Sequence, residues 1–267
     1  MLTGYVPGAD ALSVVARLVD RLKSINPNLV YVLDPVMGDD GRIYVSESVI
    51  PIYKALMPKA SCATPNCFEA ELLTDVKILD AASLRLALKV LHERYRIPNV
   101  VISAVSLPTD ELRLLGVPDS HLTSSRMLLC AGSTLTSPPG APVESTSFGI
   151  VFPELVEHYE GIGDVFSSLM LARFPSLSAL ADAPERLHAI SPLAYTAELA
   201  IGSLQGVLAH TRRYALQLAK GSPGSIVARE GETAEERVRR LRMVELRLVQ
   251  SQKELLDPEI KFFAVKL

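Results

Sequence analysis

The chain has 267 residues, 48% of them hydrophobic, with 27 basic and 30 acidic residues and a formal net charge of −3. This length and apolar content fit one large domain with a buried core, and the balanced charge argues against a nucleic-acid or anionic-membrane partner. The three cysteines show no metal-site spacing, which is typical of a reducing compartment, and no apolar run has the length of a membrane span or the features of a leader. We therefore expect a cytoplasmic protein.

The first half of the chain alternates between amphipathic stretches and short apolar runs. Residues 11–23 place Leu and Val at three- and four-residue spacings, which predicts a helix, and 29–33 form a continuous apolar run typical of a buried strand. The alternation continues with a helix over 49–57, a strand near Cys62, a helix over 83–95 and a strand over 99–103. This order indicates βαβ units and a largely parallel sheet.

The second half predicts a few more strands and then mostly helices. Residues 132–147 are rich in Ser, Thr, Pro and Gly, so we expect a mobile surface loop there. The expected strands are 127–131, 148–151 and 261–265, and the expected helices begin at Asp164 and include two long ones between 190 and 256, the last over 235–253. No repeat or linker divides the chain, so residues 1–267 are expected to form a single domain.

Residues 161–164 read Gly-Ile-Gly-Asp and open an apolar helical stretch. Backbone N–H groups at a helix N-terminus bind phosphate, and glycines let the phosphate approach closely. A carboxylate at the same place, Asp164, could act as a general base toward an attacking hydroxyl. The alternative is a tight glycine turn in which Asp164 only caps the helix.

Two more polar segments follow expected strands. Asp34 and Asp39 come after the run 29–33, where ligands of open α/β sheets bind, and could hold Mg²⁺; a solvated Pro/Gly/Asp turn is the alternative. In the segment 64–71, Asn66 is placed to cap a helix with Glu69 three residues later, which is also the spacing of a capping box.

Together these segments predict one rim of a sheet with carboxylates, an amide and an anion-binding helix start. This combination favours phosphoryl transfer over hydride transfer, redox chemistry or hydrolysis by a Ser/His/Asp set. No Walker lysine loop is present, and the five histidines are scattered along the chain.

The same segments resemble the pyridoxal kinase branch of the ribokinase-like kinases. The matching stretches, in family order, are 2–5, 34–39, 42–45, 64–66 with 68–73, 100–103, 161–164 and 246–260. The stretch 64–73 is specific to this branch, whereas Gly-x-Gly-Asp is shared by the wider superfamily. The resemblance implies a ribokinase-like three-layer α/β/α fold with a mostly parallel central sheet.

The resemblance also implies an activity and a set of site residues. Asp164 would deprotonate the 5′-hydroxyl of pyridoxal, pyridoxine or pyridoxamine for attack on the γ-phosphate of ATP. The implied roles are nucleotide and anion binding by Asn66, Glu69, Ser103, Gly161, Ile162 and Gly163; Mg²⁺ and K⁺ or Na⁺ binding by Asp34, Asp39, Thr64 and Glu69; and a flap over the substrate carrying Tyr44. Family members are typically cytosolic homodimers.

Two departures from the family pattern matter. The chain begins at the Leu-Thr-Gly-Tyr stretch, so the resemblance predicts a chain without its N-terminal strands and vitamin pocket, a segment on the order of 80 residues. Ile162 stands where most pyridoxal kinases have Thr, and one lost hydrogen bond to a charged group, worth about 1.5 to 3 kcal/mol, predicts weakened transfer.

Two further readings are compatible with the residues. One is a related kinase for a hydroxymethylpyrimidine or a sugar, which the stretch 64–73 disfavours. The other is a catalytically impaired nucleotide-binding fragment, motivated by the start of the chain and by Ile162.

Overall fold

The structure is a computed structural model that describes residues 1–138, 140–174, 184–185, 190–219, 224, 226–229 and 231–267. Within this part of the chain, a seven-stranded sheet has the order β1-β2-β5-β6-β7-β8-β9, and β3 and β4 form a separate hairpin. The strands are β1 Leu2–Thr3, β2 Val32–Leu33, β3 Gly38–Asp39, β4 Arg42–Ile43, β5 Cys62–Ala63, β6 Asn99–Ser106, β7 Met127–Leu135, β8 Ser145–Pro153 and β9 Val265–Lys266.

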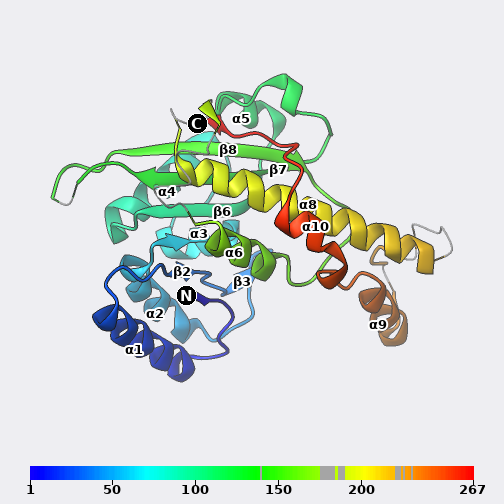
Figure 1. Cartoon of the computed structure of the whole chain (residues 1–267), viewed down its shortest axis with the longest axis horizontal. Helices are drawn as coiled ribbons and strands as arrows, with labels where there is room; N and C mark the ends of the chain where they lie inside the picture. Colours follow the sequence, from blue (N-terminus) through cyan, green and yellow to red (C-terminus); the bar gives the residue numbers. More distant parts are fainter. Residues whose placement is uncertain (139, 175–183, 186–189, 220–223, 225, 230) are drawn as a thin grey trace.

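The helices cover both faces of this sheet (Figure 1). They are α1 Ala9–Ile25, α2 Ile50–Leu56, α3 Cys67–Thr74, α4 Ala81–Tyr95, α5 Thr109–Leu114, α6 Ile162–Ala172, α8 Pro192–Leu218, α9 Ala234–Met243 and α10 Gln252–Leu256. None of the helices in the described ranges is both long and apolar enough to span a bilayer.

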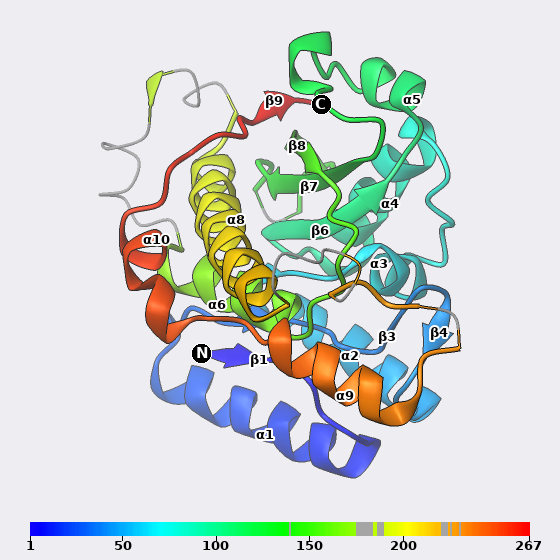
Figure 2. The same cartoon turned by 90° about the vertical axis from the view of Figure 1, so that its right-hand side faces the viewer.

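Alternate residues of the strands point into two hydrophobic clusters. Leu33, Ala63 and Ile102 face a cluster formed with α1 to α4, whereas Val32 and Cys62 face the opposite cluster, formed with α6 and α8. Figure 2 shows α6 and α8 on the side of the sheet opposite α3 and α4. The result is the predicted three-layer α/β/α arrangement, which follows from strands that are apolar on both faces.

The prediction of parallel strands holds for β1, β2, β5 and β6, which pair in parallel. The strands β7, β8 and β9 extend this sheet in antiparallel orientation. The expected surface loop over 132–147 is too long, because β7 and β8 pair continuously from Met127↔Pro153 to Leu135↔Ser145, which leaves only residues between these two strands as the connection. The Ser and Thr residues at both ends of the predicted loop occupy paired strand positions, where their backbone groups bond to the neighbouring strand; they are Ser133, Thr134, Ser145, Thr146 and Ser147.

Two expectations near the C-terminus also need correction. The predicted long helix over 235–253 ends at Met243 and resumes as α10 at Gln252. Between them, Arg247 donates its backbone N–H to Thr211 Oγ1 of α8 at 3.1 Å, and its guanidinium lies 3.7 Å from the centre of the Tyr214 ring. Between α9 and α10, contacts with α8 therefore take the place of backbone hydrogen bonds within a continuous helix. The final strand lies at Val265–Lys266 rather than at 261–265.

Candidate functional site

The carboxyl ends of three neighbouring parallel strands place the predicted site residues at one edge of the sheet. Gly4 follows β1, Asp34 follows β2 and Thr64 follows β5, and these strands pair in that order. Backbone bonds continue the ladder to the site itself: Asp34 N–H donates to Thr3 O at 2.9 Å, and Thr64 N–H donates to Leu33 O at 3.0 Å.

Helix α6 brings Asp164 to the same edge. A Cβ built on Gly4 would lie 3.4 Å from Asp164 Oδ1, so the glycine leaves space beside this carboxylate. Gly161 is the N-cap of α6, with a φ of 80°, and makes no side-chain capping bond. A Cβ on Gly163 would meet no atom within 4 Å. The helix start is therefore open for an anion, and the positive φ explains the glycine at 161.

Asp34 is a buried carboxylate, with 5% of its surface exposed, rather than part of a solvated turn. Its Oδ2 accepts a hydrogen bond from Ser167 Oγ at 2.9 Å, and Thr64 Oγ1 lies 2.8 Å from the same serine oxygen. Burial raises the pKa of Asp34 to about 7; the Ser167 bond opposes this shift and the charge of Asp164 adds to it.

Asn66 and Glu69 form the capping box that their spacing predicts. Asn66 Oδ1 accepts from Glu69 N–H at 2.8 Å, and Glu69 Oε2 accepts from Asn66 N–H at 2.9 Å. The same two side chains hold the loop after β2: Glu69 Oε1 accepts from Met37 N–H at 2.9 Å, and Asn66 Nδ2 donates to Gly38 O at 2.8 Å. Burial raises the pKa of Glu69 to about 8 against the effect of these N–H donors. Their nucleotide and metal roles stay predictions.

Three other predicted residues surround this core. Asp39 is exposed on the β3–β4 hairpin, and its Oδ1 accepts from Asp40 N–H at 2.9 Å. Tyr44, 57% exposed, follows β4; partial burial and then the charges of Glu69, Asp39, Asp34 and Asp164 raise the pKa of Tyr44 to about 12. Ser103 N–H donates to Pro65 O at 3.0 Å, which places β6 beside Thr64.

The donor set suits a hard cation. Within the described ranges, no Lys, Arg or His side chain forms an ion pair with Asp34, Asp39 or Asp164, so their negative charges are uncompensated by basic groups. In the same ranges, no three His, Cys, Asp or Glu side chains form a complete metal cluster. Carboxylates that leave positions open are what Mg²⁺ uses when phosphate oxygens complete its shell.

Ser167 is the site residue that the sequence did not single out. It lies three residues after Asp164 on α6, which puts both on the same side of the helix. That spacing is the signal that could have revealed it. Ile162, in contrast, packs its side chain against the hydrophobic cluster beneath α6 and α8.

This chain is similar to known proteins in sequence and in fold. The sequence model of the family described as phosphomethylpyrimidine kinase matches residues 1–127. The pyridoxal kinase of Homo sapiens is 31% identical over 269 residues, covering 97% of this chain and 72% of the human protein. The pyridoxal kinase of Dictyostelium discoideum is 30% identical over 268 residues, covering 100% of this chain and 74% of that protein.

The structure of the pyridoxal kinase from Leishmania donovani in complex with ADP has a TM-score of 0.70 and 27% identity, covering 99% of this chain and 73% of that one. The chain spans 61% of the length of one curated relative, a putative pyridoxal kinase of Schizosaccharomyces pombe, and 74% of the length of the Dictyostelium discoideum protein. The sequence identity over most of both chains, together with the shared ribokinase-like fold, shows that this chain belongs to the pyridoxal kinase family.

Proposed function

We propose that this chain transfers the γ-phosphoryl group of ATP to the 5′-hydroxyl of pyridoxal, pyridoxine or pyridoxamine. The observation that carries the proposal is the meeting of Asp164, Gly4 and Asp34 at one edge of the sheet, beside the open N-terminus of α6. Structures of the Leishmania donovani pyridoxal kinase are described with ADP and pyridoxamine and with ADP and pyridoxine, which supports these substrates.

Each residue has a defined task in this proposal. Asp164 takes the proton from the 5′-hydroxyl, because a carboxylate that forms no ion pair with a basic side chain of the described ranges can act as a base. The N–H groups of Gly161, Ile162 and Gly163 hold the phosphate oxygens as negative charge develops. Tyr44 lies over the site on the hairpin, and Asn66, Glu69 and Ser103 shape the nucleotide side.

The proposal includes cations held by the chain. Asp34 and Asp39, with Thr64 and Glu69 beside them, would hold Mg²⁺ and a monovalent K⁺ or Na⁺. When bound, Mg²⁺ neutralises negative charge on the phosphates. We also propose that the chain acts as a cytoplasmic homodimer, as the family resemblance implies.

The direct test is pyridoxal 5′-phosphate formation by the full chain with Mg²⁺-ATP, followed by absorbance. Loss of a general base lowers turnover by about 10² to 10⁴, so the turnover of D164N should be lower than that of the parent chain by this factor. D40N controls for the loss of one carboxylate, because Asp40 is exposed in the turn between β3 and β4 and its backbone has a φ of 48°, which Asn tolerates. Equal background rates for D164N and the parent chain would refute the kinase proposal for this chain.

A second substrate class has one specific observation in its favour, the match of residues 1–127 to the phosphomethylpyrimidine kinase family. The same assay with hydroxymethylpyrimidine as acceptor, read by ADP release, separates the two. Faster turnover of the pyrimidine than of pyridoxal would assign the chain to that substrate class. ADP binding without turnover of either acceptor would identify a nucleotide-binding fragment.

A further inference from the structure

Ser167 joins three elements of the site through one hydroxyl group. It is 1% exposed on α6, with Asp34 Oδ2 at 2.9 Å and Thr64 Oγ1 at 2.8 Å. Asp34 and Thr64 follow two neighbouring strands, β2 and β5, and are themselves buried. A single side chain therefore connects the helix that carries Asp164 to both strand ends.

The directions of these two bonds follow from the groups involved. An ionised carboxylate can only accept, so Ser167 donates its hydrogen to Asp34. Because the single hydroxyl hydrogen of Ser167 points to Asp34, Ser167 Oγ accepts the second hydrogen bond from the hydroxyl of Thr64. The hydrogen bonds thus run from Thr64 through Ser167 to Asp34, and removing the serine hydroxyl leaves both neighbours without this partner.

Two other buried helical hydroxyl groups donate within their own helices, whereas Ser203 of α8 donates to Glu254 O outside its helix and far from the site. Thr74 Oγ1 donates to Ala70 O at 2.7 Å and Thr211 Oγ1 donates to Val207 O at 2.8 Å, each within its own helix. This back-bonding to the residue four positions earlier is the ordinary way in which a helical hydroxyl is satisfied. The bonds of Ser167 instead leave its helix and end at the site.

We propose that Ser167 is a positioning residue for phosphoryl transfer, whose hydroxyl holds the carboxylate of Asp34 and helix α6 in one fixed arrangement. Ser167 and Asp164 are about 4.5 Å apart along the helix axis, so anchoring the serine also sets where the Asp164 carboxylate lies. The inference rests on the proposed function and adds a residue that acts through Asp34 rather than on the substrate.

The first test compares S167A with S168A in the full chain. Ser168 is the next residue of α6 and is exposed, so it controls for the loss of a serine hydroxyl from this helix. S167A should lower kcat about ten-fold or more, since a hydrogen bond to a charged group is lost, while the KM for pyridoxal stays within about two-fold. S168A should match the parent. Equal kcat values for S167A and the parent would overturn the proposal.

A double-mutant cycle separates positioning from a general packing effect. If Ser167 acts through the charge of Asp34, S167A should have little further effect in a D34N background. A packing role would give the same fold-loss in both backgrounds and would overturn the proposal. S167C serves as a second variant should S167A fold poorly, because the thiol is of similar size and only a weak donor. The kcat of S167C should lie between those of the parent and S167A.

A binding measurement makes the test independent of turnover. Calorimetric titration of the full chain with ADP, with and without Mg²⁺, gives the gain in affinity that the metal provides. S167A should reduce this gain about ten-fold and leave metal-free ADP binding unchanged, whereas an unchanged gain would overturn the proposal. A parent chain that shows the Mg²⁺ gain but phosphorylates no acceptor would contradict the proposed function, and the titration would still decide the role of Ser167.

Discussion

Ile162 shows how one residue can serve packing at a position next to the phosphate site. It is the first residue of α6, and its side chain packs against the cluster beneath α6 and α8. The family pattern has a threonine here, whose hydroxyl could reach a bound anion. This chain therefore has apolar contact where a hydrogen-bond donor is usual.

Replacing this residue should separate the two contributions. I162T should raise kcat by about ten-fold, through a new hydrogen bond to a charged phosphate, and should lower stability by about 1 kcal/mol through lost apolar contact. I162V loses a similar contact without gaining a hydroxyl, so it should lower the melting temperature with no gain in rate. Initial rates and thermal melts of both variants test this, and equal rates for them would contradict it.

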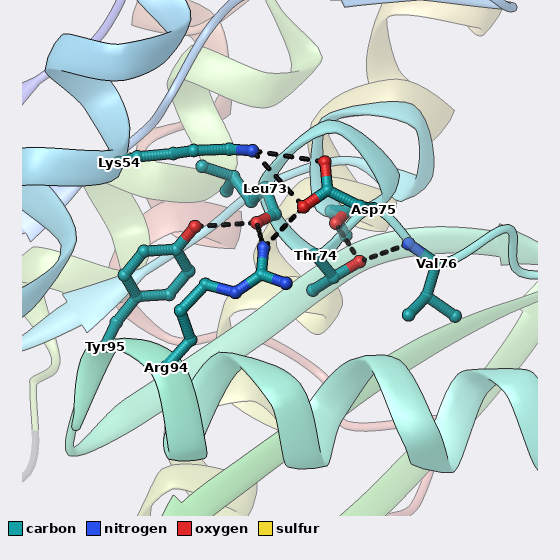
Figure 3. Close-up of polar contacts among 8 residues, drawn as sticks. Lys54, Leu73, Thr74, Asp75, Val76, Arg94 and Tyr95 are labelled. Carbon is teal, nitrogen blue, oxygen red and sulfur yellow. Dashed lines mark hydrogen bonds and ion pairs between the residues drawn. The ribbon is translucent and has the colours of Figure 1, made fainter.

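At the scale of an element, α3 is held at both ends by different means. Its N-terminus is the capping box of Asn66 and Glu69 at the site. At its other end, shown in Figure 3, Asp75 adopts a φ of 63° and pairs with Lys54 and Arg94, while Tyr95 OH donates to Leu73 O at 2.7 Å. The Arg94 hydrogen bond, with a smaller effect from Lys54, lowers the pKa of Asp75.

The two ends should respond differently to the loss of one bond. Y95F should lower the free energy of unfolding by about 1 kcal/mol, because it removes the hydrogen bond from the Tyr95 hydroxyl to Leu73 O. Turnover should stay unchanged, because this bond lies at the end of α3 away from the site. N66A should cost about 1 kcal/mol or more and also lower turnover, because Asn66 holds the Gly38 loop as well as the helix. Denaturant unfolding with parallel rate measurements checks both, and a Y95F variant with reduced turnover would contradict the separation.

At the scale of the whole molecule, a buried polar chain links α4 to the antiparallel strands. His92 is fully buried, with Nδ1 2.8 Å from Ile97 O and Nε2 2.9 Å from Ser133 Oγ, and Ser147 Oγ donates to Ser133 Oγ at 3.1 Å. A carbonyl only accepts, so the neutral ring donates from Nδ1 and accepts at Nε2. Burial lowers the pKa of His92, against the opposing effect of the Ile97 bond.

This lowered pKa gives the fold a dependence on acid. The unfolded chain binds a proton at His92 below about pH 6.5 while the folded chain resists it, so the contribution is complete above that pH and is lost as the pH falls toward the lowered pKa. H92Q cannot titrate, so its stability should decline less between pH 7 and pH 5 than that of the parent. Urea midpoints measured across this range test the difference, and parallel curves would contradict it.

Local sequence patterns were sufficient where one element satisfies its own bonds. The helix predicted over 11–23 is α1, that over 83–95 is α4, and the Asn66 and Glu69 spacing forms the predicted capping box. The segments that were misjudged depend on partners far along the chain. Residues 132–135 of the Ser- and Thr-rich stretch extend β7 by pairing with β8, and the helix expected to reach Lys253 is interrupted by contacts with Tyr214 and Thr211.

The same division applies to the site. Residues adjacent in the chain were enough to predict which side chains follow the strands, that glycines and an aspartate open α6, and which family the chain resembles. Three features of the site could not be predicted in this way: Gly4 lies beside Asp164, Asp34 is buried without a basic partner in the described ranges, and Ser167 bonds to Asp34 across 133 positions. The reason is physical: burial and side-chain hydrogen bonds between distant segments arise only when the sheet and its helices pack together.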